Sequence, residues 1–409
     1  MRGFRERATV EAAREVALDG LEPLPGENVS VESCAGRVLA TDVAAEVDVP
    51  PFRRAAMDGY AVVAEDTFGA TLYDPIALRL VGESLPGGPG AHRTTAVGRG
   101  EACRIMTGAR VPDGADAVLM AEDAEERGDE VLARAAVTPG KNVGRVGEDV
   151  ARGDLVLARG RRLRPQDVGL LASIGHHPVR CVRRPRVRIL VSGDELLPPG
   201  KKPRAGRIVD SNTPMLAALI ERDGGRVEAA LRLRDDPQAI GAALRAGADL
   251  ADVVVAAGGS SVGREDHLPG LVRELGELPV HGVAMRPSSP TGIGRIGATP
   301  VFLLPGNPVS CLCAYDFFAG PAVRVLAGLA ADWPHARVKL PLARRISSQV
   351  GRVDYVRVRV TDGAAEPLAT SGASILSSTT RASGFVIVPA SSEGLADGAE
   401  VEVRLYDGP

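Results

Sequence analysis

The sequence is poor in several features that mark particular classes of protein. Aromatic residues make up only 3% of the chain, which leaves little material for the base-stacking surface of a single-stranded nucleic-acid binder. The formal net charge of −3 gives no general attraction to nucleic acid or to a membrane surface. The longest apolar runs have the length of a strand, and the opening stretch "MRGFRERATVEAAREVALDG" lacks the apolar core of a secretory signal. We therefore expect a cytoplasmic protein that binds neither nucleic acid nor membrane.

Cysteine is scarce as well. Of the five cysteines only Cys311 and Cys313 are close together, in "PVSCLCAYDFF", and the six histidines are scattered. An odd and dispersed set of cysteines favours reduced thiols over a disulfide framework or a zinc site.

The pattern of the chain changes along its length. Short strands joined by Gly/Pro turns, from about residue 61 to residue 137, predict a small mainly-β domain. From Arg183 onward strands alternate with helices, which predicts a parallel sheet with helices on both faces. Beyond Ala327 the short strands return and predict a small β-barrel or sandwich. One helix is expected to begin near Pro165, and another after Ser211 or Asn212 as its cap.

The strongest functional signal lies where the predicted parallel strands end. Ligands of open α/β sheets bind beyond the carboxyl ends of the strands, and "RILVSGDEL", "VVVAAGGSSVGRED" and "VFLLPGNP" each place small or acidic residues there. A fourth strand ends in Asp235-Asp236. The site residues expected at this edge are Ser192, Gly193, Asp194, Glu195, Asp235, Gly258, Gly259, Ser260, Ser261, Gly263, Asp266, Pro305, Gly306, Asn307 and Pro308.

These residue types predict a phosphate site that needs a cation. Gly and Ser residues form a cradle for phosphate, whereas Glu195, Asp235 and Asp266 repel it unless a hard cation such as Mg²⁺ lies between them. The internal reading is a Mg²⁺-dependent site for a pyrophosphate or nucleotide ester. The motif "GGSSVG" matches neither the Walker pattern nor G-x-G-x-x-G, and alone it is explained equally well by a tight turn. The prediction therefore depends on the convergence of all four loops.

The same segments resemble the MoeA family, the molybdopterin molybdenumtransferases, of which the gephyrin E domain is a relative. The matching stretches run in family order along essentially the whole chain: "AAMDGYAV", "RIMTGARVPDGADAVLMAE", "GRVGEDVARGD", "LLASIG", "RPRVRILVSGDEL", "RIVDSN", "DVVVAAGGSSVGRED" and "LPGNPVS". The resemblance implies a multi-domain α/β plus β protein.

The implied domains can be assigned to residues. A central MogA-like α/β domain with a parallel-type sheet covers residues 182–327, and a C-terminal β-barrel covers 328–409. A small mainly-β domain takes 28–44 with 55–139. An elongated N-terminal linking domain takes 1–27 with 45–54 and 140–181.

The resemblance also implies a reaction. Family members combine adenylylated molybdopterin with molybdate in the presence of Mg²⁺, release AMP and leave molybdenum on the dithiolene. The glycine-rich loop would hold the pyrophosphate, and Glu195, Asp235 and Asp266 would be the metal and phosphate carboxylates. The family is an elongated homodimer with a shared site, so Asp58 and Thr107 would reach the partner's site. Contacts with molybdopterin adenylyltransferase and with cofactor-accepting enzymes are also expected.

Further residues match polar positions of the family. Asp149, in "GED", is expected among the catalytic acids, and Arg352, Arg357 and Ser371 are expected near the site. Each of these residues could instead have a purely structural role. Asp58 and Thr107 could shape turns, Asp149 could cap, and the arginines could lie on an exposed β face, which we slightly favour.

The chain departs from the family in one stretch. Where the family often has "KPGKP", this chain has "RPSSP", with Arg286 at the first lysine and Ser289 before Pro290 at the second. Arg286 keeps a cation that binds oxyanions, whereas Ser289 keeps only a hydrogen-bond donor. The lost cation would weaken oxyanion binding by about 1–3 kcal/mol unless Arg295 or His267 compensates. The departure bears on molybdate affinity and on the choice between molybdate and tungstate.

Two other functions are alternatives to this molybdenum-inserting reaction, called the insertase reaction below. Molybdopterin adenylyltransferase uses a related α/β domain, but the additional domains at both ends favour the insertase. A non-catalytic scaffold would keep the fold, and the missing lysine is its only support.

Overall fold

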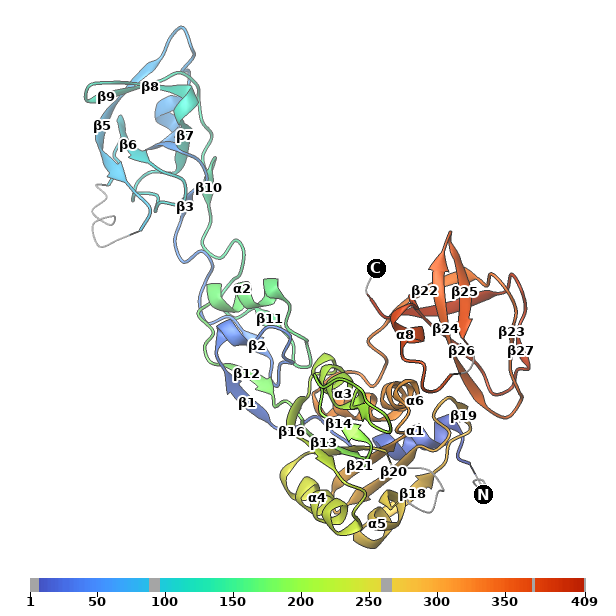
Figure 1. Ribbon diagram of the computed structural model, residues 1–409. Helices are drawn as coiled ribbons and strands as arrows, with labels where there is room; N and C mark the ends of the chain where they lie inside the picture. Colours follow the sequence, from blue (N-terminus) through green and yellow to red (C-terminus); the bar gives the residue numbers. More distant parts are fainter. Residues whose placement is uncertain (1–6, 88–95, 259–266, 370–371, 408–409) are drawn as a thin grey trace. The chain divides into compact units, whose positions relative to one another are not determined.

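The chain folds into two compact units. The structure, a computed structural model, describes residues 7–87, 96–258, 267–369 and 372–407 (Figure 1). The first unit contains residues 1–28, 36–40 and 180–409, and we call it the α/β unit. The second contains residues 29–35 and 41–179, and we call it the β unit. The predicted site residues that lie outside the described ranges are Gly259, Ser260, Ser261, Gly263, Asp266 and Ser371.

The β unit is built on one six-stranded sheet, as its alternating short strands predict. The strands follow the order β7-β4-β6-β5-β9-β8. Every residue of the central strand β4 is buried, because apolar clusters cover both faces of the sheet. The bounds are β4 Gly59–Val62, β5 Ile76–Ser84, β6 Glu101–Ile105, β7 Ala117–Met120, β8 Ala124–Arg127 and β9 Glu130–Ala133.

Three two-stranded pairs connect segments that are distant in the sequence. The pairs are β1 (Gly26–Val29) with β12 (Val179–Val182), β2 (Val43–Ala44) with β11 (Leu155–Leu157), and β3 (Arg54–Ala55) with β10 (Val143–Gly144). Residues 28–44 were assigned to the small β domain, but β2 bonds to β11 and Leu39 bridges Cys181, so this segment pairs with the linking residues instead. Helix α2 (Pro165–Ser173) begins at the predicted proline.

The α/β unit contains a second six-stranded sheet, in the order β16-β13-β17-β21-β20-β18. The first four strands are parallel, as the alternation of strands and helices predicts. Strands β20 and β18 extend this parallel-type sheet with antiparallel pairs at one edge, which the sequence did not indicate. The bounds are β13 Arg186–Ser192, β16 Arg226–Leu233, β17 Val253–Ala257, β18 Glu277–His281, β20 Gly292–Ile296 and β21 Thr299–Leu304.

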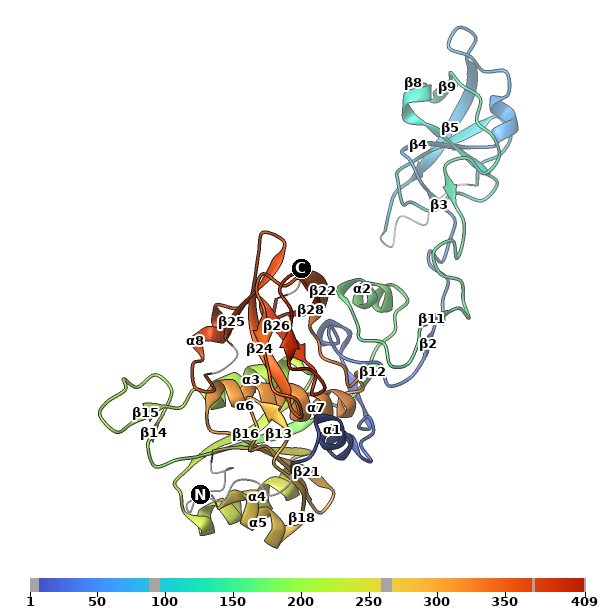
Figure 2. The same cartoon turned by 90° about the vertical axis from the view of Figure 1, so that its right-hand side faces the viewer.

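Helices cover both faces of this sheet (Figure 2). Alternate residues of β17 face opposite ways, so Val253 and Val255 join one apolar cluster while Val254 and Ala256 join another. The first cluster includes α1 (Val10–Leu18), α3 (Asn212–Arg222) and the long helix that follows β21. The second includes α4 (Pro237–Leu250) and α5 (Leu268–Leu275). Residues 1–27 were expected in the linking domain, but α1 belongs to this core.

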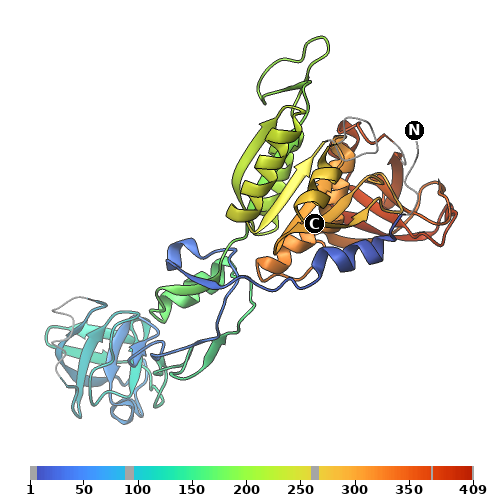
Figure 3. The ribbon, with the colours of Figure 1, turned by 90° about the horizontal axis from the view of Figure 1, so that it is seen from below.

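The long helix after β21 has three parts: α6 (Pro308–Ala314), the π-helical turn η4 (Tyr315–Ala319) and α7 (Gly320–Leu326). Among the described residues it is the one helix long and apolar enough to cross a membrane, and 89% of its apolar window is buried inside the protein. Figure 3 shows α1 beside this helix.

The C-terminal strands form a third six-stranded sheet within the α/β unit. Five of its strands follow the order β19-β24-β26-β28-β22, and the sixth strand, β25, also pairs with β24. A bridge between Leu342 and Ala365 connects the end of β22 to β25 and closes the sheet toward the expected barrel. Strand β19 lies between β18 and β20 in the sequence, although those two strands belong to the other sheet of this unit. The bounds are β19 Met285–Arg286, β22 Ala336–Pro341, β24 Val353–Thr361, β25 Ala364–Ala369, β26 Gly384–Val388 and β28 Glu400–Leu405.

Candidate functional site

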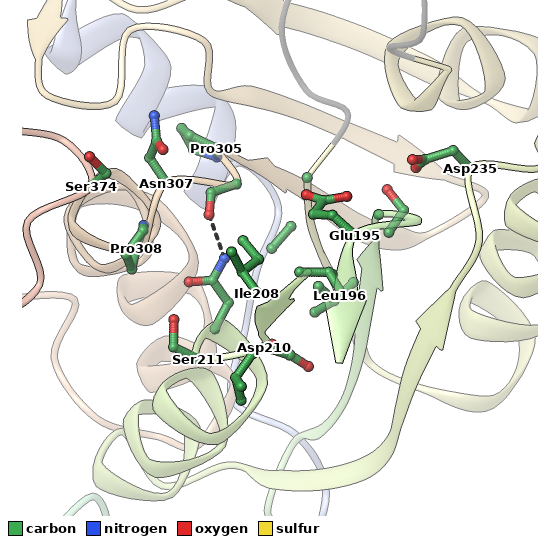
Figure 4. Close-up of a pocket in the computed structure, with 18 of the residues that line it drawn as sticks. Glu195, Leu196, Ile208, Asp210, Ser211, Asp235, Pro305, Asn307, Pro308 and Ser374 are labelled. Carbon is green, nitrogen blue, oxygen red and sulfur yellow. Dashed lines mark hydrogen bonds between the residues drawn. The ribbon is translucent and has the colours of Figure 1, made fainter. Parts of the chain in front are cut away.

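A cleft of about 670 Å³ opens at the carboxyl ends of the parallel strands. The predicted site residues that line it are Ser192, Gly193, Glu195, Asp235, Gly258, Pro290, Pro305, Gly306, Asn307 and Pro308. Figure 4 shows Glu195 and Asp235 on one side, with Asn307, Pro308 and Ser374 on the other. The structure therefore brings the described parts of all four loops to one place. The roles assigned to these residues stay predictions.

The backbones of these loops approach one another closely. Gly258 directly follows β17 and has φ +98°, and a Cβ at this position would lie 2.5 Å from the carbonyl oxygen of Ser192. A Cβ on Gly306 would lie 3.5 Å from the Cα of Gly258. Position 258 therefore requires glycine, because any side chain would be strained by the positive φ and would collide with the Ser192 carbonyl oxygen.

The described wall of the cleft is acidic. Glu195, Asp210 and Asp235 line it, and no described lining residue is Lys, Arg or His. Asp210 is buried and accepts hydrogen bonds from the Thr213 hydroxyl at 2.7 Å and from Arg232 at 3.4 Å. Asp235 accepts one from the backbone N–H of Asp194 at 3.1 Å.

Glu195 makes no ion pair within the described chain. The described residues contain no group of three or more His, Cys, Asp or Glu side chains that could hold a metal. Two of the three predicted metal ligands, Glu195 and Asp235, nevertheless share the cleft. Their carboxylate oxygens are of the type that Mg²⁺ prefers. The third predicted ligand, Asp266, lies outside the described residues.

Asp194 does not line the cleft. Its side chain is exposed and pairs with Arg234 at 3.2 Å. The neighbouring Asp236 caps α4, because its carboxylate accepts from the N–H groups of Gln238 and Ala239.

Four polar lining residues were not predicted as site residues: Asp210, Ser211, Asn212 and Ser374. Ser211 is the N-cap residue of α3, one of the two residues predicted for that position, but its side chain makes no capping hydrogen bond; Asp210 accepts from the N–H of Thr213 instead. Asn212 donates to the carbonyl oxygen of Gly306 at 2.7 Å and so links α3 to the loop after β21. The segment "RIVDSN" carried the signal, since it follows a strand and is richer in polar residues than one cap requires.

The residues at the altered lysine positions lie apart from the described lining. Arg286 donates to the carboxylate of Asp354, a buried group that also accepts from Ser348 at 2.7 Å and Arg352 at 3.0 Å. Ser289 has a buried hydroxyl without a partner in the described chain, and only the adjacent Pro290 lines the cleft.

The arginines offered as substitutes or as surface residues are also placed. Arg295 contacts Asp19, and neither residue lines the cleft. Arg357 is fully buried in β24, so the exposed-face alternative is wrong for this residue. Burial lowers the pKa of the Arg357 guanidinium.

The β unit holds the other predicted catalytic residues. Asp58 accepts hydrogen bonds from the Thr107 hydroxyl at 2.7 Å and from the Thr107 N–H at 2.6 Å. These bonds, first that from the hydroxyl, hold the pKa of the Asp58 carboxyl below its ordinary value. Thr107 lines a hollow of about 530 Å³ together with Arg54 and Glu148, which pair at 3.1 Å.

Asp149 is exposed, and its backbone N–H bonds to the carbonyl of Val49. Its neighbour Glu148, which the sequence analysis did not single out, lines the hollow instead. The motif "GED" therefore presents its glutamate to the hollow of the β unit.

Comparisons with known proteins agree with this architecture. One family model, described as MoeA N-terminal region (domain I and II), matches residues 8–175. A second, described as "Probable molybdopterin binding domain", matches residues 188–325 and so includes nearly all of the sheet that carries the cleft. A third, described as MoeA C-terminal region (domain IV), matches residues 339–406.

Similar proteins match most of the chain. Molybdopterin molybdenumtransferase 2 of Mycobacterium tuberculosis is 39% identical over 74% of this chain and 75% of its own. Molybdopterin molybdenumtransferase of Staphylococcus aureus is 30% identical over 98% of this chain and 96% of its own. The crystal structure of a molybdopterin biosynthesis MoeA protein from Pyrococcus horikoshii is 36% identical, with a TM-score of 0.83, and covers 98% of this chain and 100% of that one.

These relatives identify the chain as a transferase of molybdenum cofactor biosynthesis. The chain belongs to the MoeA family, because the three family models together match most of its length.

The Asp58–Thr107 contact predicts a measurable titration. Thr107→Val removes the hydroxyl donor and keeps the backbone donor, so the pKa of Asp58 should rise toward the ordinary aspartate value of about 3.9. A pH titration of the Asp58 carboxyl carbon by NMR measures this shift. Thr107→Ser, which keeps the hydroxyl, should titrate as wild type. An unchanged pKa in Thr107→Val would show that the hydroxyl does not stabilise the carboxylate.

The close approach at Gly258 predicts a large cost for the smallest side chain. Gly258→Ala should lower the free energy of unfolding by at least about 2 kcal/mol, since its Cβ meets a backbone carbonyl in a strained conformation. Gly270→Ala is the matched control in α5, where nothing lies within 4 Å of the added Cβ. It should be neutral or stabilising by up to about 1 kcal/mol. Urea unfolding of both variants tests this, and equal stability would contradict the geometry.

Proposed function

We propose that this protein is the molybdenum insertase of molybdenum cofactor biosynthesis. It transfers molybdenum from molybdate to adenylylated molybdopterin and releases AMP. The observation that carries the proposal is the cleft, where the ends of four parallel strands place Ser192, Gly258 and Gly306 near Glu195 and Asp235. Relatives named molybdopterin molybdenumtransferase, similar along most of the chain, support the choice of reaction.

The reaction balances without an external oxidant or reductant. Two thiol protons leave with one molybdate oxygen as water while two molybdenum–sulfur bonds form, and molybdenum keeps its oxidation state. Water adds across the phosphoanhydride, whose phosphorus–oxygen bond breaks to give AMP and the phosphorylated pterin. The chain must therefore bind two anions in one place and orient the phosphoanhydride toward water.

The donor set of the cleft fits Mg²⁺. Glu195 and Asp235 offer carboxylate oxygens from neighbouring loops, Glu195 without an ion-pair partner in the described chain, and Asp266 would join them. Mg²⁺ held there would neutralise the charge of the phosphoanhydride and make it more electrophilic. The backbone of Gly258 and the hydroxyl of Ser192 would orient the anion, which the absence of bulky side chains allows.

The β unit supplies the second half of the proposal. Asp58 and Thr107 form an exposed, hydrogen-bonded pair, and in a homodimer this pair would complete the cleft of the partner subunit. The low pKa of Asp58 keeps it ionised, so it would accept a hydrogen bond rather than donate a proton. We also propose a cytoplasmic location and contacts with molybdopterin adenylyltransferase and cofactor-accepting enzymes.

Two alternative functions predict different biochemical results. An adenylyltransferase would consume ATP and form adenylylated molybdopterin. A scaffold would bind partners without turnover, and Glu195 and Asp235 would then be dispensable.

The test is AMP release from adenylylated molybdopterin, with and without Mg²⁺ and molybdate. Wild type should release AMP only when Mg²⁺ is present, and molybdate should stimulate the release. Glu195→Gln and Asp266→Asn should each lower kcat at least about 100-fold, the scale lost when charge stabilisation at a reacting phosphate is removed.

Asp249→Asn is the matched control, because Asp249 is an exposed carboxylate on α4 that lines no described cleft. It should keep wild-type kcat. Wild-type protein that binds the substrate but releases no AMP, or full activity in both acidic-residue variants, would refute the insertase.

A further inference from the structure

The loop between β14 (Leu196–Leu197) and β15 (Ile208–Val209) carries an unusual charge. Its residues 198–207, "PPGKKPRAGR", contain Lys201, Lys202, Arg204 and Arg207 and no acidic residue. Every residue from 198 to 207 is exposed. We call this segment the basic loop. Figure 2 shows it projecting from the α/β unit.

The cations of the basic loop are not used by the fold. None of the four takes part in an ion pair with a described residue, although arginines elsewhere pair repeatedly with carboxylates. One contact is structural: Arg207 donates to the carbonyl oxygen of Leu196 at 3.3 Å, and its backbone pairs with Arg204. Lys201, Lys202 and Arg204 therefore present three uncompensated charges to solvent.

The choice of residue types is informative. Lys201 and Lys202 are two of the four lysines in a chain with 49 basic residues. Arginine fixes carboxylates in bidentate geometry, whereas the lysine ammonium is a strongly hydrated point charge on a flexible stem. Lysine therefore suits attraction over a distance better than a fixed contact.

The basic loop starts and ends at the cleft. Glu195 and Leu196, just before it, and Ile208 and Val209, just after it, line the cleft directly. The described cleft wall contains carboxylates and no cation, so it repels an approaching anion. Arg234, an exposed arginine after β16, is paired with Asp194. Among the described residues that flank the cleft, the basic loop carries the uncompensated positive charge.

We propose that the basic loop attracts the phosphoanhydride-bearing substrate and accelerates its entry into the cleft. This inference is additional to the proposed reaction but depends on its anionic substrate. The charges act by raising the local concentration of a polyanion at the rim, which increases the association rate and not the chemical step. The effect extends over about 30 Å at 0.01 M ionic strength and about 8 Å at 0.15 M.

The test is the association rate of ADP, carried by a fluorescent derivative, with the full-length protein in Mg²⁺. The variant changes Lys201→Gln, Lys202→Gln and Arg204→Gln together and keeps Arg207, which holds the loop. At about 0.01 M ionic strength its association rate constant should be roughly 3- to 10-fold below wild type, and the gap should close near 0.5 M salt. The dissociation rate constant should change little.

A matched control removes the same charge elsewhere on the α/β unit. Arg226→Gln, Arg245→Gln and Arg359→Gln alter three exposed arginines, none of which lines the cleft. This variant should associate nearly as wild type. Equal rates for the two triple variants at low salt, or a deficit in the loop variant that does not depend on salt, would overturn the inference.

The assay separates this inference from the proposed reaction. If wild type releases AMP but the loop variant associates normally, the loop proposal alone fails, and an acidic protein partner becomes the next occupant to test. If wild type does not bind ADP in Mg²⁺, both proposals are contradicted.

Discussion

Four adjacent parallel strands determine where the cleft of the α/β unit lies. Strands β16, β13, β17 and β21 exchange hydrogen bonds in one direction, so their carboxyl ends meet at one edge. Loops that leave a shared edge must pass close to one another, and Gly258 is the point of closest approach because a Cβ there would overlap Ser192. The apolar alternation of β17 secures helices on both faces and leaves this edge as the open side.

The edge also has an electrostatic constraint. Its described polar side chains are carboxylates, hydroxyls and amides, and three described arginines of this unit are engaged: Arg286 by Asp354, Arg232 by Asp210 and Arg234 by Asp194. Under the proposed function, an anionic substrate would meet no cation on the described wall of the cleft, and the basic loop would guide it in. The proposed Mg²⁺ and the proposed role of the basic loop answer the same imbalance at two distances, one within the cleft and one outside it.

The sequence predicted most of this because strand periodicity and loop composition are local signals. The predicted strands β13, β17 and β21 occur as expected, and Pro165 begins α2. What failed depends on long-range pairing. The antiparallel β18 and β20, the core position of α1 and the pairing of residues 28–44 are decided by which surface each segment covers. The engagement of Arg286 required knowing that β19 lies beside β24, and the sequence did not show that Asp210, rather than the N-cap residue Ser211, accepts the capping hydrogen bond.

The most direct test of this account is a calorimetric titration of AMP into the full-length protein, with and without Mg²⁺. An acidic cleft that accepts phosphate only through a bridging cation predicts an affinity at least about tenfold higher in Mg²⁺, equal to about 1.4 kcal/mol. Equal affinity in the two titrations would contradict the account. The acidic wall would then have no part in holding the nucleotide, and the anion would have to bind elsewhere on the chain.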